Sequence, residues 1–123
     1  MAKFAIQWGV PEMADLWKDL SGKADSDKLS GGELELFKKL VKTATFLAEN
    51  PAHPGLNSHE IADLTHRYGE RVWQSYLENR KPAAGRLYWM YGPGRGVITV
   101  IGLEPHPERG GYARVRLSRP RGR

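Results

Sequence analysis

The sequence predicts a single α+β domain in which two N-terminal helices pack on one face of a small antiparallel sheet. Before Asn50, apolar residues recur mainly at helical spacing, whereas after Arg71 they alternate with polar residues, as in strands. The chain has 123 residues, of which 40% are hydrophobic, so it is long enough to bury one core but not two.

The N-terminal segment predicts a strand followed by a helix. Residues 3–10 alternate apolar and polar side chains, which is typical of a strand. Pro11 follows, and proline is common at the first position of a helix. Apolar residues at helical spacing then predict a short helix over residues 12–20, and the polar residues 21–29 predict a loop.

A second, longer helix is predicted from residue 30 to about residue 49. Ser30 and Glu33 have the spacing of a capping box, in which each side chain bonds the backbone amide of the other residue. Asn50 and Pro51 end the helix. The expected buried stripe consists of Leu34, Phe37, Leu40, Val41, Ala44 and Leu47.

The C-terminal half predicts a strand meander. Strands are expected over residues 71–77, 86–91 and 97–104. A polar loop over residues 78–83 joins the first two, and the glycine-rich residues 92–96 form a hairpin turn between the second and the third. Residues 58–70 have only a weak helical pattern and are left without an assignment.

Positive charge is concentrated at the end of the chain. Residues 105–123 contain six arginines and one acid, Glu108, which accounts for the whole net charge of +5. We therefore divide the chain into a domain of residues 1–106 and a basic tail of residues 107–123. A neutral body with a basic edge favours a polyanionic partner, and nucleic acid is the commonest.

The composition also bears on disulfides, membrane spans and metal sites. The chain has no cysteine, which excludes disulfides and cysteine-based zinc sites and fits a reducing compartment. No apolar run approaches the roughly 20 residues of a membrane span, so we expect a cytoplasmic protein without a membrane partner. The spacing of His53, His59 and His66 matches no metal-ligand pattern, so neither a metal nor another cofactor is expected.

Strand alternation groups several polar and aromatic side chains on one face. Gln74 and Tyr76 should share a face with Arg86 and Tyr88, while the residues between them point toward the helices. If that face is open, arginine could bind phosphate and the tyrosine rings could stack on bases. The alternative is that the tyrosines have a structural role, covering the sheet, and bind no nucleic acid.

His106 follows the last predicted strand and could exchange a proton near neutrality. RNA carries its own nucleophile, the 2′-hydroxyl, so a cleavage site needs only a base, an acid and charge stabilisation. His106 and Tyr112 could move the protons, and Arg86 and Arg109 could stabilise the transition state. The alternative is that His106 is a solvated surface residue.

The chain resembles the RelE/ParE toxin superfamily between about Lys3 and Tyr112. The resemblance consists of the order strand–helix–helix–strand–strand–strand, the Asn-Pro break after the second helix, and the segment Gly85-Arg86-Leu87-Tyr88-Trp89. The segment Val97-Ile98-Thr99-Val100-Ile101-Gly102 is similar to the next strand of the family. RelE-type members are small bacterial toxins that cleave mRNA in the ribosomal A site and are neutralised by an antitoxin, whereas ParE-type members poison DNA gyrase.

The resemblance implies roles for individual residues. Arg86 matches an arginine that contacts the scissile phosphate, His106 falls where the nucleases place a catalytic arginine or histidine, and Tyr112 falls near a C-terminal tyrosine that some of them use. The chain departs from the family at Gln74 and Tyr76, where RelE has catalytic lysines. It also lacks, in residues 50–57, the glutamate that another branch uses as a base.

The resulting hypothesis is a toxin that acts as a ribosome-dependent, metal-independent mRNA endoribonuclease, with ribosome-bound mRNA and a cognate antitoxin as partners. The alternative is a non-catalytic binding protein of the same fold, either a ParE-like gyrase inhibitor or an RNA-binding domain. The expected catalytic residues are Arg86, His106 and Tyr112. The expected nucleic-acid contacts are Tyr76, Lys81, Tyr88, Arg109, Arg114 and Arg116.

Overall fold

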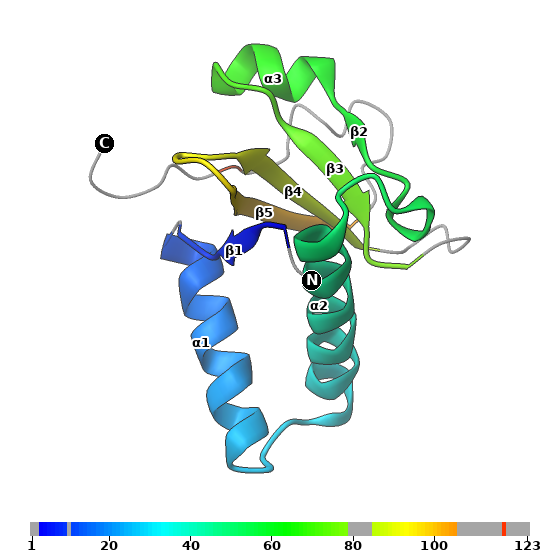
Figure 1. Ribbon diagram of the computed structural model, residues 1–123. Helices are drawn as coiled ribbons and strands as arrows, with labels where there is room; N and C mark the ends of the chain where they lie inside the picture. The colour runs from blue at the N-terminus through cyan, green and yellow to red at the C-terminus, as the bar shows by residue number, and fades with distance from the viewer. Residues whose placement is uncertain (1–2, 10, 79–84, 106–116, 118–123) are drawn as a thin grey trace.

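The computed structural model describes residues 3–9, 11–78, 85–105 and 117, and it has an α+β fold (Figure 1). The helices are α1 (Pro11–Asp25), α2 (Gly31–Glu49), the 3-10 turn η1 (Pro54–Leu56) and α3 (Ala62–Tyr68). The strands are β1 (Ala5–Gln7), β2 (His59–Glu60), β3 (Trp73–Tyr76), β4 (Gly85–Tyr91) and β5 (Val97–Pro105). Figure 1 shows α1 and α2 beneath the sheet and α3 above it. The predicted class, with two N-terminal helices packed against a sheet, is confirmed.

The sheet has the strand order β1-β5-β4-β3-β2. Strands β2 to β5 pair antiparallel, but β1 pairs parallel with β5, with Ile6 opposite Ile98. The prediction of a wholly antiparallel sheet is therefore wrong for β1. Antiparallel neighbours are commonly joined by a short hairpin, whereas β1 leads into α1 and meets β5 only after the rest of the fold.

Helix α1 is longer than the sequence pattern predicts. The expected loop over residues 21–29 is helical up to Asp25. Ser21 Oγ donates to the carbonyl of Trp17 at 2.5 Å, and Ser26 Oγ donates to that of Gly22 at 2.8 Å. These serines bond the preceding helical turn, so a polar composition alone was a poor sign of a loop.

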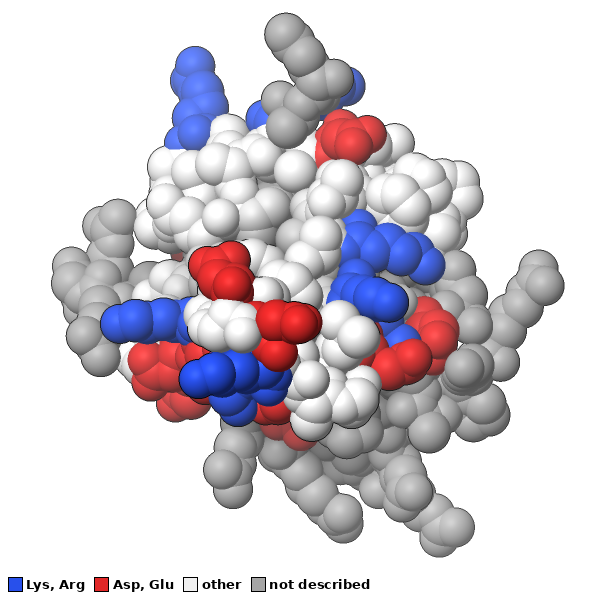
Figure 2. All heavy atoms as spheres, turned by 90° about the horizontal axis from the view of Figure 1, so that it is seen from below, with Lys and Arg blue, Asp and Glu red and all other residues white. Residues whose placement is uncertain are grey.

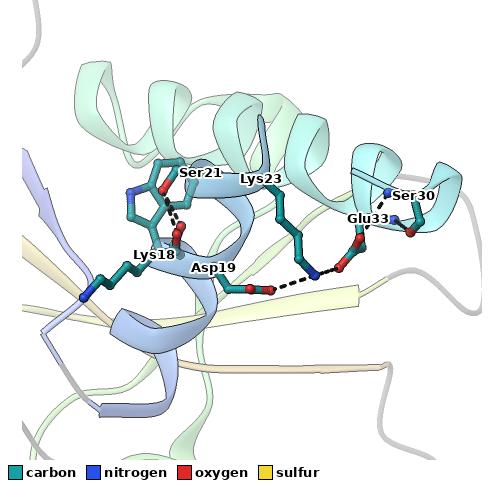
Figure 3. Close-up of polar contacts among 7 residues, drawn as sticks. Lys18, Asp19, Ser21, Lys23, Ser30 and Glu33 are labelled. Carbon is teal, nitrogen blue, oxygen red and sulfur yellow. Dashed lines mark hydrogen bonds and ion pairs between the residues drawn. The ribbon is translucent and has the colours of Figure 1, made fainter. Parts of the chain in front are cut away.

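The predicted capping box at the start of α2 is confirmed (Figure 3). Ser30 Oγ accepts from the Glu33 amide at 3.2 Å, and Glu33 Oε1 accepts from the Ser30 amide at 3.0 Å. The other oxygen of Glu33 accepts from Lys23 Nζ at 2.6 Å, and Asp19 also lies 3.4 Å from that ammonium group. Glu33 therefore both caps α2 and joins it to α1.

The buried stripe of α2 is rotated from the predicted one. Leu40, Thr43 and Leu47 are buried, whereas Leu34 is 41% exposed and Val41 is 39% exposed. A stripe of apolar side chains alone does not include Thr43, although Thr43 lies within the helical spacing of the two buried leucines. The stripe contacts a sheet whose centre includes the fully buried Trp89.

The unassigned residues 58–70 form the edge strand β2 and helix α3. Leu64 and Tyr68 are the buried residues of α3, and the helix ends at Gly69, which has a positive φ of 91°. A helix of only seven residues shows too few turns for a clear periodic signal. No helix among the described residues combines the length and apolar character needed to cross a membrane.

The rotated stripe of α2 predicts that replacing two leucines of this helix by alanine lowers the free energy of unfolding by different amounts. Leu40→Ala removes a fully buried side chain and should lower the free energy of unfolding by about 2–5 kcal/mol. The matched control Leu34→Ala changes an exposed side chain and should stay within about 0.5 kcal/mol of wild type. Urea denaturation followed by circular dichroism measures both, and equal losses would contradict the assigned stripe.

The capping box also predicts an acid-sensitive link. The pKa of Glu33 is lowered from its ordinary value of 4.5 to about 2, first by the bond from Lys23 and then by the Ser30 amide. A lowered carboxyl pKa stabilises the fold above pH 4.5, and this contribution is lost as the pH falls toward 2. Lys23→Met should raise the Glu33 pKa toward its ordinary value, whereas the control Lys28→Met should not. Carboxyl NMR titration tests this, and an ordinary Glu33 pKa in the wild type would contradict it.

Candidate functional site

Side chains from three adjacent strands form a row across one face of the sheet. In the β3–β4 register, Tyr76 is opposite Arg86 and Gln74 is opposite Tyr88, while His59 of β2 is opposite Gln74. Directly opposed residues of paired strands lie on the same face. The structure therefore confirms that the polar and aromatic residues singled out from the sequence share a face, and it adds His59 to them.

The expectation that this face is open is wrong. Gln74 is 1% exposed, Arg86 is 5% exposed and Tyr88 is fully buried, so only Tyr76 of the four keeps an appreciable exposed area. Leu87, on the opposite face of β4, is also fully buried. Alternation shows which residues share a face but not what covers that face, and the centre of this sheet is covered on both sides.

Arg86 and Tyr76 are in contact within the row. The guanidinium carbon of Arg86 lies 3.9 Å from the centre of the Tyr76 ring, which places the cation over the ring face. A ring face attracts a cation, and the attraction strengthens when water is excluded. Glu104 of β5 is the Cα partner of Arg86 and brings a half-buried carboxyl group to the same face. The row thus combines a buried cation, a tyrosine and a carboxyl group.

His59 is the exposed member of the row. Its ring meets Tyr76 edge to face, with ring centres 6.2 Å apart and planes at 84°. Its Nδ1 lies 3.0 Å from the backbone carbonyl oxygen of Asn57. The sequence predicts no role for His59, because a two-residue strand shows no periodic pattern that could place this histidine beside Tyr76.

The other predicted site residues all lie outside the described residues: Lys81, His106, Arg109, Tyr112, Arg114 and Arg116. Their predicted roles remain predictions. The described end of β5 nevertheless fixes where the chain leaves the sheet, because Pro105 is the Cα partner of Gly85, the residue before Arg86. Leu117 is described again and packs against the core.

The remaining histidines differ from His59. His53 Nδ1 accepts from the Gly55 amide at 2.9 Å, and its ring stacks on Phe46 with centres 4.2 Å apart, so it shapes the turn at η1. His66 is exposed on α3. Within the described ranges, no three His, Asp or Glu side chains gather in a way that could hold a metal ion.

The helical end of the molecule carries mixed charge. Figure 2 looks at the protein from below the sheet and shows acidic and basic side chains interspersed, with neither sign dominant. The sequence from Pro105 onward holds the whole excess of positive charge. A surface for a polyanion is therefore not found on this end of the described molecule.

Comparisons of the chain with models of protein families, with curated proteins and with solved structures each found no match. A functional proposal therefore rests on the residues and the geometry described above.

Proposed function

We propose that this chain is a RelE-like toxin of a toxin–antitoxin pair, which cleaves mRNA on the ribosome without a metal. The contact that carries the proposal is the one between Arg86 and Tyr76, near the edge of the sheet where β5 ends. It brings a cation and a phenol to the strand position where the resemblance expects the phosphate contact. The 2′-hydroxyl of RNA supplies the nucleophile, so the protein needs only to move protons and stabilise charge.

Arg86 would stabilise the transition state mainly through its field. Because it is only 5% exposed, little of its guanidinium can form direct bidentate bonds with a phosphate at the surface. A buried charge is screened less by water and salt than an exposed one, so its attraction reaches farther. Negative charge that develops on the phosphate above Tyr76 would therefore be favoured.

His106 and Tyr112 would complete the reaction as proton carriers. Chain connectivity ties His106 to Pro105, whose Cα partner is Gly85, so His106 follows the strand end that lies beside Arg86. Tyr112 comes six residues later in the sequence. These two roles rest on the resemblance and on that strand end.

The basic residues after β5 would bind the RNA backbone. Arg109, Arg114 and Arg116 follow β5 in the sequence, and Lys81 precedes β4 in the sequence. Arginine and lysine neutralise phosphates and contribute affinity that depends little on sequence. A cognate antitoxin would be the protein partner.

A second candidate function is binding without cleavage, as in a gyrase-directed toxin or an RNA-binding domain. One observation favours it: Gln74, Arg86 and Tyr88 are buried, so the face expected to meet the substrate offers little exposed surface. A protein that only binds needs no reactive groups within reach of a phosphate. Cleavage and binding must therefore be measured separately.

The nuclease proposal predicts a large loss of cleavage in two single variants. His106→Ala removes a proton carrier and should slow cleavage about 10²–10⁴-fold. Arg86→Ala removes the stabilising charge and should slow it about 10²–10³-fold. Because both residues serve one transition state, the double variant should lose less than the product of the two losses. The measurement is cleavage of mRNA on programmed ribosomes.

Matched controls separate these effects from general damage. Arg95→Ala removes an exposed arginine from the β4–β5 turn, and His66→Ala removes an exposed histidine from α3; both should cleave like wild type. Circular dichroism checks that each variant is folded. Undiminished cleavage by folded His106→Ala would exclude that histidine, and wild type that binds RNA without cutting it would establish the second candidate instead.

The basic C-terminal residues predict salt-dependent RNA binding. Truncation after Leu117 removes Arg119, Arg121 and Arg123. Binding to single-stranded RNA weakens with salt by a slope of about −0.7 per phosphate neutralised, so the truncation should flatten the slope by up to about 2. A control that replaces Lys18, Lys38 and Lys42 with glutamine removes the same charge from the helices and should keep the slope. Fluorescence titrations at several salt concentrations measure it, and an equal slope in the truncated protein would rule out phosphate contacts by these arginines.

A further inference from the structure

His59 lies on the face of the sheet that holds Tyr76 and Arg86, but at its exposed edge. β2 is an edge strand, and its first residue, His59, is opposite Gln74. The ring of Tyr76 connects the two charged or titratable groups, because His59 meets its edge at 6.2 Å between ring centres and Arg86 covers its face at 3.9 Å. A ligand that contacts His59 and Tyr76 therefore also lies close to the buried cation.

The hydrogen bond of His59 fixes which ring nitrogen carries the proton. Nδ1 lies 3.0 Å from the carbonyl oxygen of Asn57, and a carbonyl oxygen can only accept. Nδ1 of the neutral ring must therefore be the protonated nitrogen, and Nε2 is left with a free lone pair. Nε2 forms no hydrogen bond within the part of the chain that the structure describes, and the residue is exposed.

The turn before β2 holds this arrangement in place. Asn57 has a positive φ of 48°, a left-handed conformation that asparagine adopts more readily than most residues. The residue closes the 3-10 turn η1, whose Leu56 is almost fully buried. A backbone anchored by a buried leucine therefore presents the carbonyl that orients the His59 ring. His53 differs from His59 because its Nδ1 accepts a hydrogen bond, from the Gly55 amide, instead of donating one. Its ring is stacked on Phe46.

We propose that His59 is the general base of RNA cleavage at this face, and that its Nε2 removes the proton of the 2′-hydroxyl. This inference rests on the proposed nuclease function. In the step, the O2′–H proton moves to Nε2 as O2′ forms a bond to phosphorus. The bond from phosphorus to O5′ breaks, and the departing O5′ takes a proton from the acid, which is the role that the proposed function leaves to His106 or Tyr112. The products are a 2′,3′-cyclic phosphate and a 5′-hydroxyl, and no oxidant, reductant or further reactant is needed.

Tyr76 and Arg86 fit the other requirements of this step. The partly exposed Tyr76 ring offers an aromatic surface on which a base beside the scissile bond can stack. Arg86 lies against the Tyr76 ring and provides a buried positive charge close to the phosphate. The base, the stacking surface and the cation come from β2, β3 and β4, so their spacing is set by sheet hydrogen bonds instead of by a loop.

Three variants test the assignment in single-turnover cleavage on programmed ribosomes. His59→Ala should slow cleavage about 10²-fold or more, which is the usual contribution of a positioned base. His59→Asn can still donate to the Asn57 carbonyl but has no ring Nε2, so it should be equally slow although the turn is kept. His66→Ala, an exposed histidine on α3, is the matched control and should cleave like wild type.

Two further readouts separate a base from a structural or binding residue. Free imidazole in the buffer should partly restore cleavage by His59→Ala but not by Arg86→Ala. Affinity for an RNA with 2′-deoxyribose at the scissile position should be the same for His59→Ala and for wild type. A slow His59→Ala that imidazole does not rescue, or one that has lost affinity for this RNA, would overturn the assignment.

The outcomes also distinguish this inference from the function on which it rests. Wild type that cleaves, together with His59→Asn that cleaves as fast, would overturn the role of His59 and leave the nuclease function intact. Wild type that does not cleave would overturn both. Slow cleavage by both His59 variants, with rescue by imidazole and unchanged RNA affinity, would establish the base.

Discussion

The pairing of β4 with β5 is the constraint on which the rest of the structure depends. Leu87 and Tyr88 are neighbours in β4, point to opposite faces and are both fully buried. A shift of one residue in the register would move every side chain of the strand to the opposite face. Because both faces are buried here, neither could accommodate the side chains of the other. An extra residue of β5, Ile101, interrupts the ladder between Tyr88 and Trp89 and is itself buried. A bulge of this kind pins the register, because a shifted ladder would have to move it.

The β4–β5 register determines the composition of the site. It places Glu104 opposite Arg86 and brings the end of β5 beside the start of β4. β3 then pairs on the other side of β4 and places the Tyr76 ring against the guanidinium. Trp89 anchors this pairing from the helical side, where its indole N–H donates to Ser75 Oγ at 2.8 Å. A buried arginine is costly unless its charge is compensated, so the cation and its neighbours depend on the same strand pairing that forms the core.

The sequence predicts the helices and strands better than it predicts which of their side chains are buried. The capping box at Ser30 and the strand positions of Tyr76 and Arg86 follow from local spacing, which a single chain displays directly. The burial of Arg86 and the rotated stripe around Thr43 depend on tertiary packing, which local spacing does not contain. β2 was missed for a related reason: two residues show no alternation, and only pairing with β3 makes them a strand. His59 was therefore visible in the sequence as a histidine but not as a neighbour of Tyr76.

Burial also decides which groups of this face can meet a ligand. A large polyanion cannot reach a guanidinium that is 5% exposed, but it can reach an exposed imidazole and a partly exposed phenol ring at the β2–β3 edge. The residue that contacts the substrate and the residue that stabilises its charge would then lie at different depths. His59 would lie at the surface, Arg86 in the interior, and the Tyr76 ring between them. This arrangement shields the cation from bulk water and from the salt that would screen it. It would limit direct phosphate binding at Arg86 and leave the retention of RNA to other basic residues, which the sequence supplies after β5. The burial that counts against a direct phosphate contact by Arg86 is therefore compatible with an electrostatic role for the same residue.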